Sequence, residues 1–170
     1  GRFVDRSLFD AQFFRMPKNE AIITDPAHRI TLEVVHEAMV DAGLDHATEK
    51  DVGVFLGQCF QDYDIVAART QTTGVYHSVA NARSVLAGRI SFHYDFKAPC
   101  MTIDTACSSS LVCLDLALMN MQQDRCSKAL VGGVNVVIDP TTIDMFRTTN
   151  MLSPDFACKT FDDSANGYVR

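Results

Sequence analysis

Residues 108–123 constrain the fold most, because apolar side chains cover nearly every face of the helix that they are expected to form. A helix that is apolar all round is predicted to be buried. The apolar stretch is too short for a membrane span of roughly 20 residues, and it carries Asp115. A globular, layered protein is therefore expected. The apolar residues of this helix are Leu111, Val112, Leu114, Leu116, Leu118, Met119 and Met121.

Apolar runs of strand length occur at 52–56, 101–103 and 128–138, the last interrupted by Gly132 and Gly133. The first and last are predicted to be central strands, because strands buried on both faces are continuously apolar. The paired glycines are expected to permit tight backbone packing. They do not form a phosphate loop, because no lysine follows at the required spacing.

Helical segments separate these runs. Asp25 and Pro26 are typical of the start of a helix, apolar residues recur at helical spacing up to Ala42, and Gly43 can end it. Further helices are predicted over residues 82–90 and from Pro140 toward Phe146. Strands separated by helices predict the α/β class, with a largely parallel or mixed sheet.

Composition supports a globular enzyme core. The chain has 170 residues, 47% of them hydrophobic, which is enough to bury a core in one domain or part of one. Its net charge of −6 offers no basic stripe for nucleic acid, and no Cys/His cluster has zinc spacing. Its six scattered cysteines, without a signal peptide, predict reduced thiols and a cytoplasmic location. We expect no disulfides, no metal and no membrane partner.

Cys107 stands between the expected strand 101–103 and the helix 108–123. Backbone N–H groups and the dipole at a helix N-terminus can favour a thiolate, so this position suits a nucleophile. Ala106 and Ser108 are small and leave room for an acyl group. The alternative is that Cys107 is one more buried thiol that packs as a small apolar side chain. Local sequence alone leaves both readings open.

The run from Asp104 to Ser110, Asp-Thr-Ala-Cys-Ser-Ser-Ser, resembles the active-site signature of β-ketoacyl synthases, the condensing domains of polyketide synthases and animal-type fatty acid synthases. The resemblance covers almost the whole chain, and the strings at 25–29 and 104–110 are more similar to the polyketide type. Other matching segments are 25–44, 84–92, 132–135, 151–155, 158–162 and 166–170.

The resemblance implies a thiolase-like fold, in which helices lie between mixed sheets. Residues 1–170 are expected to be a partial ketosynthase domain that supplies most of the first of two pseudo-symmetric halves. The family's first strand is then expected before Gly1, and its second half, with two histidines, after Arg170. Such enzymes are usually homodimers, so the piece alone is expected to expose two large apolar surfaces.

The chemistry implied by the resemblance is a decarboxylative Claisen condensation. Cys107 accepts an acyl chain from the phosphopantetheine thioester of an acyl carrier protein. A malonyl-type extender then loses carbon dioxide and attacks the Cys107 thioester. The implied partners are the acyl carrier protein and an acyltransferase domain of the same synthase, and no cofactor binds directly. The fragment alone is expected to be inactive.

Two functions other than chain elongation are also open. One is a ketosynthase that loads and transfers acyl chains without condensing them, and the other is a silent domain kept for dimerisation or carrier docking. Cysteine at position 107 argues against relatives that carry glutamine there and only decarboxylate. Acylation of Cys107 separates the silent domain from the two enzymes, and elongation separates the enzymes from each other.

Other candidate residues receive structural interpretations. No histidine occupies a family catalytic motif, Ser108–Ser110 are interpreted as helix capping residues, and Cys100 and Cys113 as packing thiols. Residues Met145, Phe146 and Met151 are expected in an apolar core rather than along an acyl tunnel. The histidines are His28, His36, His46, His77 and His93.

Overall fold

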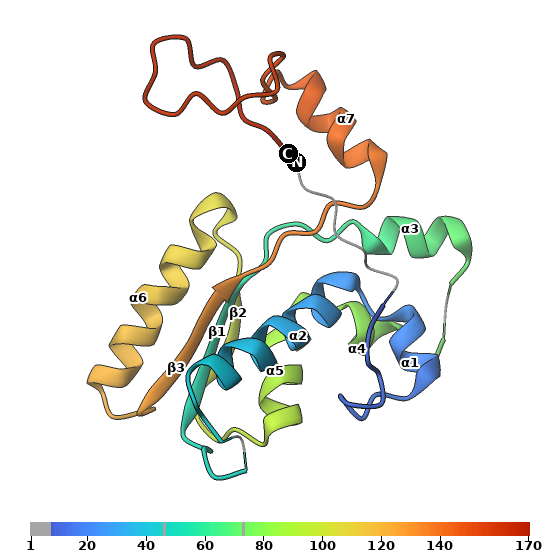
Figure 1. Ribbon diagram of the computed structural model, residues 1–170. Coiled ribbons are helices and arrows are strands. Elements are labelled where there is room, and N and C mark those ends of the chain that lie inside the picture. The colour runs from blue at the N-terminus through green and yellow to red at the C-terminus, as the bar shows by residue number, and fades with distance from the viewer. Residues whose placement is uncertain (1–7, 46, 73) are drawn as a thin grey trace.

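A parallel β-sheet forms the centre of the protein in the computed structural model, which describes residues 8–45, 47–72 and 74–170 (Figure 1). The strands are β1 (Val52–Gly57), β2 (Cys100–Ile103) and β3 (Lys128–Gly133), in the order β2-β1-β3. Both neighbours run parallel to β1, with Val54 opposite Cys100 and Val52 opposite Lys128. The expected α/β class with a parallel sheet is confirmed.

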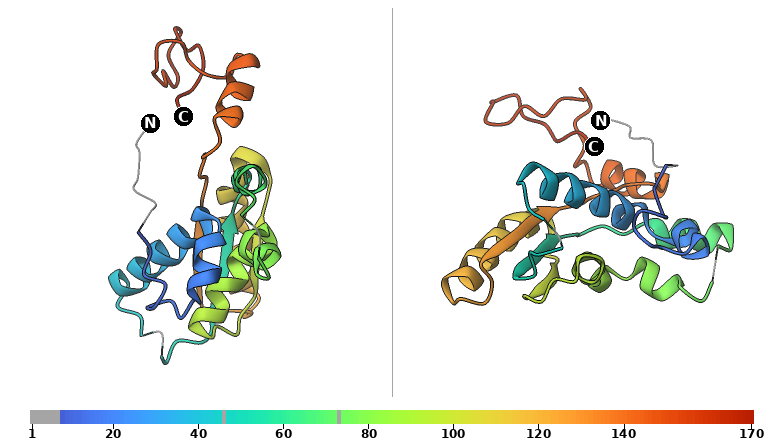
Figure 2. Two further views of the ribbon diagram at one scale, coloured as in Figure 1. Left: turned by 90° about the vertical axis from the view of Figure 1, so that its right-hand side faces the viewer. Right: turned by 60° about the horizontal axis from the view of Figure 1, so that its bottom comes forward.

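Helices cover both faces of this sheet, as Figures 1 and 2 show. On one face, α2 (Pro26–Asp41) and α5 (Arg83–Tyr94) pack in a core that includes Val54 and Leu56 of β1. On the other, α6 (Ser109–Gln122) packs through Cys113 and Ala117 against Phe55. Successive side chains of a strand point to opposite faces, so β1 supplies both cores from one apolar run.

The remaining helices lie outside the central sheet and the three helices that cover it. They are α1 (Lys18–Ile23), α3 (Tyr63–Thr70), α4 (His77–Asn81), the 3₁₀ turn η1 (Ala106–Ser108) and α7 (Pro140–Thr148). The first three were not predicted, because they are short and their apolar residues show no sustained period. Helix α7 and residues 149–170 stand away from the sheet in Figure 1 and in the left view of Figure 2.

Most predicted elements are present with shifted ends. Asp25 caps α2, its carboxylate accepting a hydrogen bond from Ala27 N at 2.7 Å, and Gly43 adopts a φ of 64° after the helix. The strand predicted over 128–138 ends at Gly133, because the following backbone leaves the sheet toward α7.

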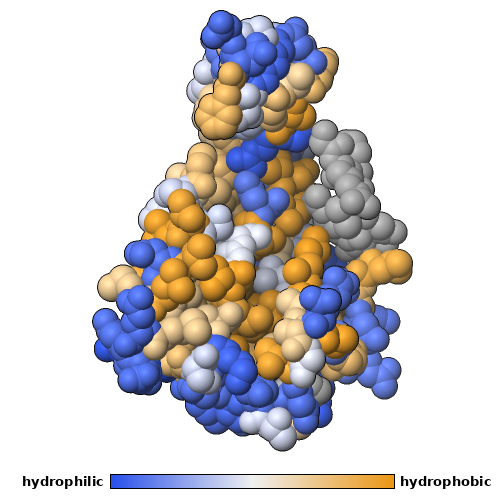
Figure 3. Space-filling model, turned by 60° about the vertical axis from the view of Figure 1, so that its left-hand side comes forward, coloured by the Kyte–Doolittle hydropathy of each residue, from blue (hydrophilic) through white to orange (hydrophobic). Residues whose placement is uncertain are grey.

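The prediction that α6 is buried is wrong for this chain. Only its side facing the sheet is covered, whereas Leu111 is 70% exposed and Leu118 is 51% exposed. Figure 3 shows apolar side chains gathered over the face of the molecule that α6 and β3 form. Two large apolar surfaces were expected, and the exposed side of α6 provides one of them. No helix among the described residues is long and apolar enough to cross a membrane.

Candidate active site

The strands of the sheet end together at one edge, at Gly57, Ile103 and Gly133. Parallel α/β sheets bind ligands in the crevice beyond the carboxyl ends of their strands. Cys107 lies there, in η1, and its side chain is exposed. It lines a cavity of about 330 Å³. The other lining residues are Gly57, Cys59, Ala106, Ser109, Ser110, Gly133, Val134 and Asn135, none of them charged.

A tight turn presents Cys107 at this edge. Ala106, directly before it, has a φ of 55°, a left-handed conformation that non-glycine residues rarely adopt. The Asp104 carboxylate accepts a hydrogen bond from Ala106 N at 3.0 Å. Ser109 Oγ accepts from Thr105 N at 2.9 Å and donates to Ala106 O at 2.6 Å. Side chains on both sides of Cys107 therefore fix the strained backbone, as is typical of functional turns.

The serines after Cys107 brace this turn instead of capping α6. Ser108 has no side-chain capping bond, and its hydroxyl donates to Thr105 O at 2.8 Å. The interpretation of Ser108 as a helix cap is therefore wrong. The tight left-handed turn at Ala106 places the Ser108 hydroxyl beside the segment that follows β2, where the carbonyl oxygen of Thr105 accepts its hydrogen bond. The Ser108 hydroxyl thus stabilises the turn that carries Cys107.

Glycines let the turn approach the sheet. A Cβ atom on Gly57 would lie 2.8 Å from Ser109 Cβ and 3.0 Å from Ser110 N. A Cβ atom on Gly133 would lie 3.3 Å from Ser110 Cβ. The tight packing expected at the paired glycines is confirmed for Gly133. A side chain at Gly57 would be tolerated less than one at Gly133. It would meet backbone atoms of the turn, which cannot move aside as a flexible side chain can.

Arg83 at the start of α5 connects the segment after β1 to the turn that carries Cys107. Its Nη1 donates to Cys59 O at 3.3 Å and to the Asp104 carboxylate at 2.5 Å. Gln58 N also donates to Ile103 O at 3.1 Å. The segment after β1 therefore runs beside the segment after β2.

Asn135 connects the cavity to the C-terminal segment. With its amide oriented to satisfy both groups, its oxygen accepts from Arg170 Nη1 at 2.5 Å. The Arg170 guanidinium carbon lies 5.0 Å from the ring centroid of Phe60 and 4.7 Å from that of Phe146. The ring centroids are themselves 5.1 Å apart, so the guanidinium lies over both rings, where cation–π attraction stabilises it.

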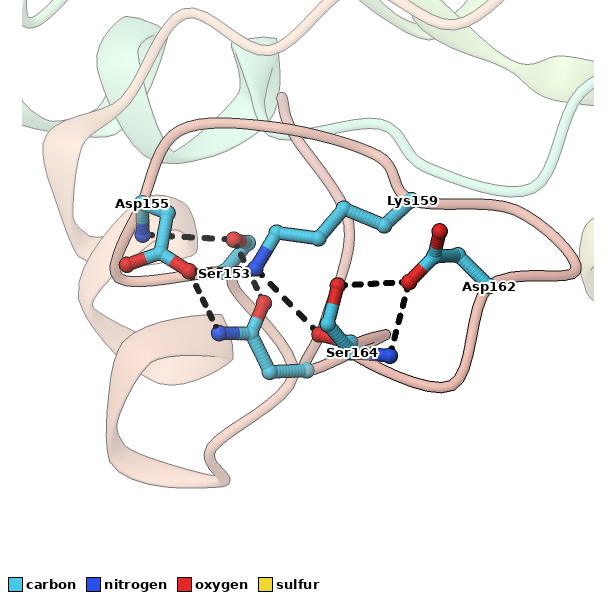
Figure 4. A network of polar contacts seen from close by, with 6 residues as sticks. Ser153, Asp155, Lys159, Asp162 and Ser164 are labelled. Carbon is cyan, nitrogen blue, oxygen red and sulfur yellow. Dashed lines mark hydrogen bonds and ion pairs between the residues drawn. The ribbon is translucent and has the colours of Figure 1, made fainter.

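The motif segments 151–155, 158–162 and 166–170 meet in one loop (Figure 4). The Asp155 carboxylate pairs with Lys159 and accepts from Asn166 at 2.7 Å, and Ser153 Oγ donates to Asn166 at 2.9 Å. These bonds lower the pKa of Asp155, the Lys159 bond contributing most. The loop is held by polar contacts within itself, which explains why these segments contain so many short polar residues.

The described histidines do not line the Cys107 cavity. His28 is fully buried, and burial lowers its pKa to about 3, with a smaller contribution from Arg89. His36 packs against Phe13, and His77 contacts Asn81. The ring of His93 lies 5.1 Å from that of Phe14. His46 lies outside the described residues.

Two structural interpretations from sequence need correction. Cys113 is buried as expected, and burial raises its pKa, but Cys100 is exposed at the first residue of edge strand β2. Phe146 is buried, whereas Met145 is 51% exposed and Met151 is 43% exposed. Neither methionine lines the Cys107 cavity, and both lie in the projecting C-terminal part, outside the two cores that flank the sheet.

Cys59, Gly57 and Asn135 were not identified as site residues from the sequence. All three lie at or just after the carboxyl end of a strand, which is the signal that could have found them. In the part of the chain that the structure describes, no three His, Cys, Asp or Glu side chains are grouped as metal ligands.

Comparisons with known proteins agree on one family. The family model "Beta-ketoacyl synthase, N-terminal domain" matches residues 1–170. A highly reducing polyketide synthase of Cryptosporiopsis sp. is 42% identical over 169 residues, which are 98% of this chain and 7% of that protein. The fatty acid synthase of Anser anser anser is 43% identical over 174 residues, covering 100% of this chain and 49% of that sequence.

Solved structures give the same result. The ketosynthase from module 6 of the bacillaene synthase of Bacillus subtilis 168 superposes with a TM-score of 0.88 at 38% identity. The match covers 99% of this chain and 29% of that one. The ketosynthase domain of an oxazolomycin synthase from Streptomyces albus gives a TM-score of 0.87 at 35% identity, with 97% and 30% covered. The chain thus spans less than half the length of each of these relatives.

Proposed function

Because the chain belongs to the N-terminal domain family of β-ketoacyl synthases, with their thiolase-like fold, we propose that Cys107 is the nucleophile of a decarboxylative condensation. The observation that carries the proposal is its position on a braced left-handed turn, exposed to an uncharged cavity at the carboxyl edge of the sheet. Packing thiols such as Cys113 are buried. A nucleophilic thiol needs the opposite, namely access to its substrate.

The first half of the reaction is acyl transfer. The Cys107 thiolate attacks the carbonyl carbon of an acyl thioester, and the thiol of the donor leaves as the new thioester forms. Gly57, Ala106 and Gly133 line the cavity around the sulfur with little or no side chain, which leaves space for the first carbons of an acyl group. Rigid support of the turn keeps the sulfur in position and so reduces the cost of alignment.

The second half is condensation. A malonyl-type thioester loses carbon dioxide, and the resulting carbanion attacks the Cys107 thioester, which releases the free thiol and a chain two carbons longer. The substrates are proposed to be carried on the phosphopantetheine arm of an acyl carrier protein. A homodimer and an acyltransferase domain of the same synthase complete the proposed assembly.

Acyl loading of the full polypeptide that carries residues 1–170 tests the first half. We expect incubation with an acyl thioester of the carrier to add one acyl group to the tryptic peptide 98–125, which contains Cys107. Cys107→Ala should abolish the adduct. Cys100→Ser removes an exposed thiol from the same peptide and should leave the acyl adduct on Cys107 unchanged.

Addition of a malonyl carrier thioester then tests condensation. A β-ketoacyl product supports the proposal, whereas acylation without elongation identifies a domain that only transfers acyl chains. Absence of any adduct on Cys107 in a folded protein would contradict its role as nucleophile and favour a silent docking domain.

A further inference from the structure

Cys59 places a second thiol in the cavity of Cys107. Both residues line the same space of about 330 Å³, and Cys59 is partly exposed while Cys107 is exposed. Neither the acyl transfer nor the condensation described above uses Cys59. Thiols of two residues that line one cavity can react with each other if one of them is oxidised.

Contacts at and just before Cys59 hold its segment beside the segment that carries Cys107. Before Cys59, Gly57 lies against Ser109, and Gln58 N donates to Ile103 O. At Cys59 itself, the carbonyl oxygen shares the Arg83 guanidinium with Asp104, three residues before Cys107. A disulfide needs Cα atoms within roughly 7 Å, and these tethers hold residues 57–59 along 103–109.

The other cysteines are unsuitable partners for Cys107. Cys113 and Cys126 are buried, and burial raises the pKa of both thiols, which lowers their thiolate content. Cys100 and Cys158 are exposed but do not line the cavity. Cys158 lies in the C-terminal loop, where Val169 N donates to its sulfur at 3.1 Å. Cys59 is therefore the thiol that geometry selects.

We propose that Cys59 is a resolving thiol, which forms a reversible disulfide with Cys107 when a peroxide oxidises the nucleophile. In the first step, the Cys107 thiolate attacks one oxygen of the peroxide, the S–O bond of a sulfenic acid forms, the O–O bond breaks, and the other oxygen leaves as hydroxide or alkoxide. In the second, the Cys59 sulfur attacks the Cys107 sulfur, the S–S bond forms, and the sulfenic oxygen leaves as water. Two thiols are oxidised and one peroxide is reduced.

The disulfide has two consequences for the site. It blocks Cys107, so that no acyl thioester can form, and it protects the sulfur from further oxidation to sulfinic and sulfonic acids. A dithiol reductant reverses it by exchange. The inference extends beyond the proposed function and does not depend on condensation, because it requires only that the two thiols meet.

Peptide mapping of the full polypeptide tests the proposal directly. The protein is treated with hydrogen peroxide, its free thiols are alkylated, and it is digested with trypsin without reduction. We expect peptide 51–69, which contains Cys59, to be linked to peptide 98–125. Fragmentation should show alkyl groups on Cys100 and Cys113 and the linkage at Cys107. Dithiothreitol should release both peptides and restore alkylation of Cys107.

Matched variants separate this pathway from simple oxidation. Cys59→Ser should lose the linked peptide, and its Cys107 should accumulate sulfinic acid that dithiothreitol does not reverse. Cys100→Ser should behave as the unmodified protein. Conversion of Cys107 to sulfinic acid while Cys59 stays fully alkylated in the unmodified protein would overturn the proposal, as would linkage of Cys107 to any other cysteine. Acyl loading without peroxide is measured in parallel, so that a failure of the proposed nucleophile is recognised separately.

Discussion

Gly57 is the position in the site at which an added side chain would be tolerated least. Its missing Cβ lets the end of β1 lie against Ser109 and the backbone of Ser110. Gly88, in the middle of α5, differs in that nothing lies within 4 Å of a Cβ built there. The two glycines therefore make a matched pair for testing whether close approach of the turn matters.

Gly57→Ala is expected to push the nucleophile turn away from the sheet and to cost about 1–3 kcal/mol of stability by overpacking. Alkylation of Cys107 by a thiol reagent should change in rate as the turn shifts. Gly88→Ala is expected to stabilise α5 by up to about 1 kcal/mol. Denaturant unfolding and alkylation rates measure both. A Gly57→Ala protein of unchanged stability and reactivity would contradict the packing described.

Asp25 caps a helix through a hydrogen bond and also has a carboxyl group with an unusual pKa. Its carboxylate caps α2 but is 2% exposed, and burial raises its pKa to about 6. In the unfolded chain the pKa is near 3.8, so the folded state binds more protons between these values. This contribution to stability is present below about pH 4 and is lost as the pH rises through 6.

Asp25→Asn keeps a good helix cap and removes the ionisation. We expect the variant to be more stable than the unmodified protein at pH 7, by up to about 3 kcal/mol, and equally stable near pH 4. Unfolding at several pH values measures the difference. Asp41→Asn changes an exposed carboxylate at the other end of α2 and should alter the profile little. Parallel pH profiles for Asp25→Asn and the unmodified protein would contradict the shifted pKa.

At the scale of elements, Asp62 fastens the segment after β3 to the start of α3. Its Oδ2 accepts from Ile138 N at 2.8 Å and from Asp139 N at 2.9 Å. Asp139 in turn caps α7 and pairs with Arg69 of α3. The direction in which α7 leaves the sheet therefore depends on one buried carboxylate.

Asp62→Ala should leave two backbone N–H groups without acceptors, each at a cost of about 1–3 kcal/mol if it remains buried. We expect faster hydrogen exchange at residues 138–141, with little change in β1. Asp64→Ala removes a nearby exposed carboxylate and serves as the control. Unchanged protection of residues 138–141 in Asp62→Ala would show that other contacts hold this segment.

The sequence predicted elements where one local signal is strong. Asp25-Pro26 and Gly43 located α2, and the apolar run at 52–56 located β1, because capping and burial leave a clear pattern within a few residues. The sequence did not predict that one side of α6 is exposed to solvent. Apolar residues on all faces indicate that a helix must be buried, but they do not show which segments bury it. The motif predicted Cys107 as the nucleophile, which stays a prediction. Cys59 was not predicted to line the same cavity, because its position depends on pairing across distant strands.

At the scale of the whole molecule, the exposed side of α6 determines how residues 1–170 behave alone. Leu111, Leu114 and Leu118 are each at least 44% exposed. Figure 3 shows a larger apolar surface on the side of the molecule where α6 lies. Exposed apolar patches of this kind promote association.

Residues 1–170 expressed alone are expected to bind a hydrophobic dye and to self-associate at micromolar concentration. Leu111→Lys with Leu118→Lys should reduce both, because these side chains contribute little to the core. Lys substitution at Phe92, 89% exposed on α5, should have a smaller effect. Light scattering and dye fluorescence measure the outcome. A monomer that binds no dye would contradict the exposed surface.

The strand order β2-β1-β3 also bears on synthesis. The central strand β1 leaves the ribosome before either neighbour, gains its first partner only when Ile103 has emerged, and its second only when Gly133 has. Until then, a nascent chain carries an apolar strand with an open edge, which invites wrong pairing with other chains. Chaperones that bind extended apolar segments therefore have their longest opportunity while the chain between β1 and β3 is being translated.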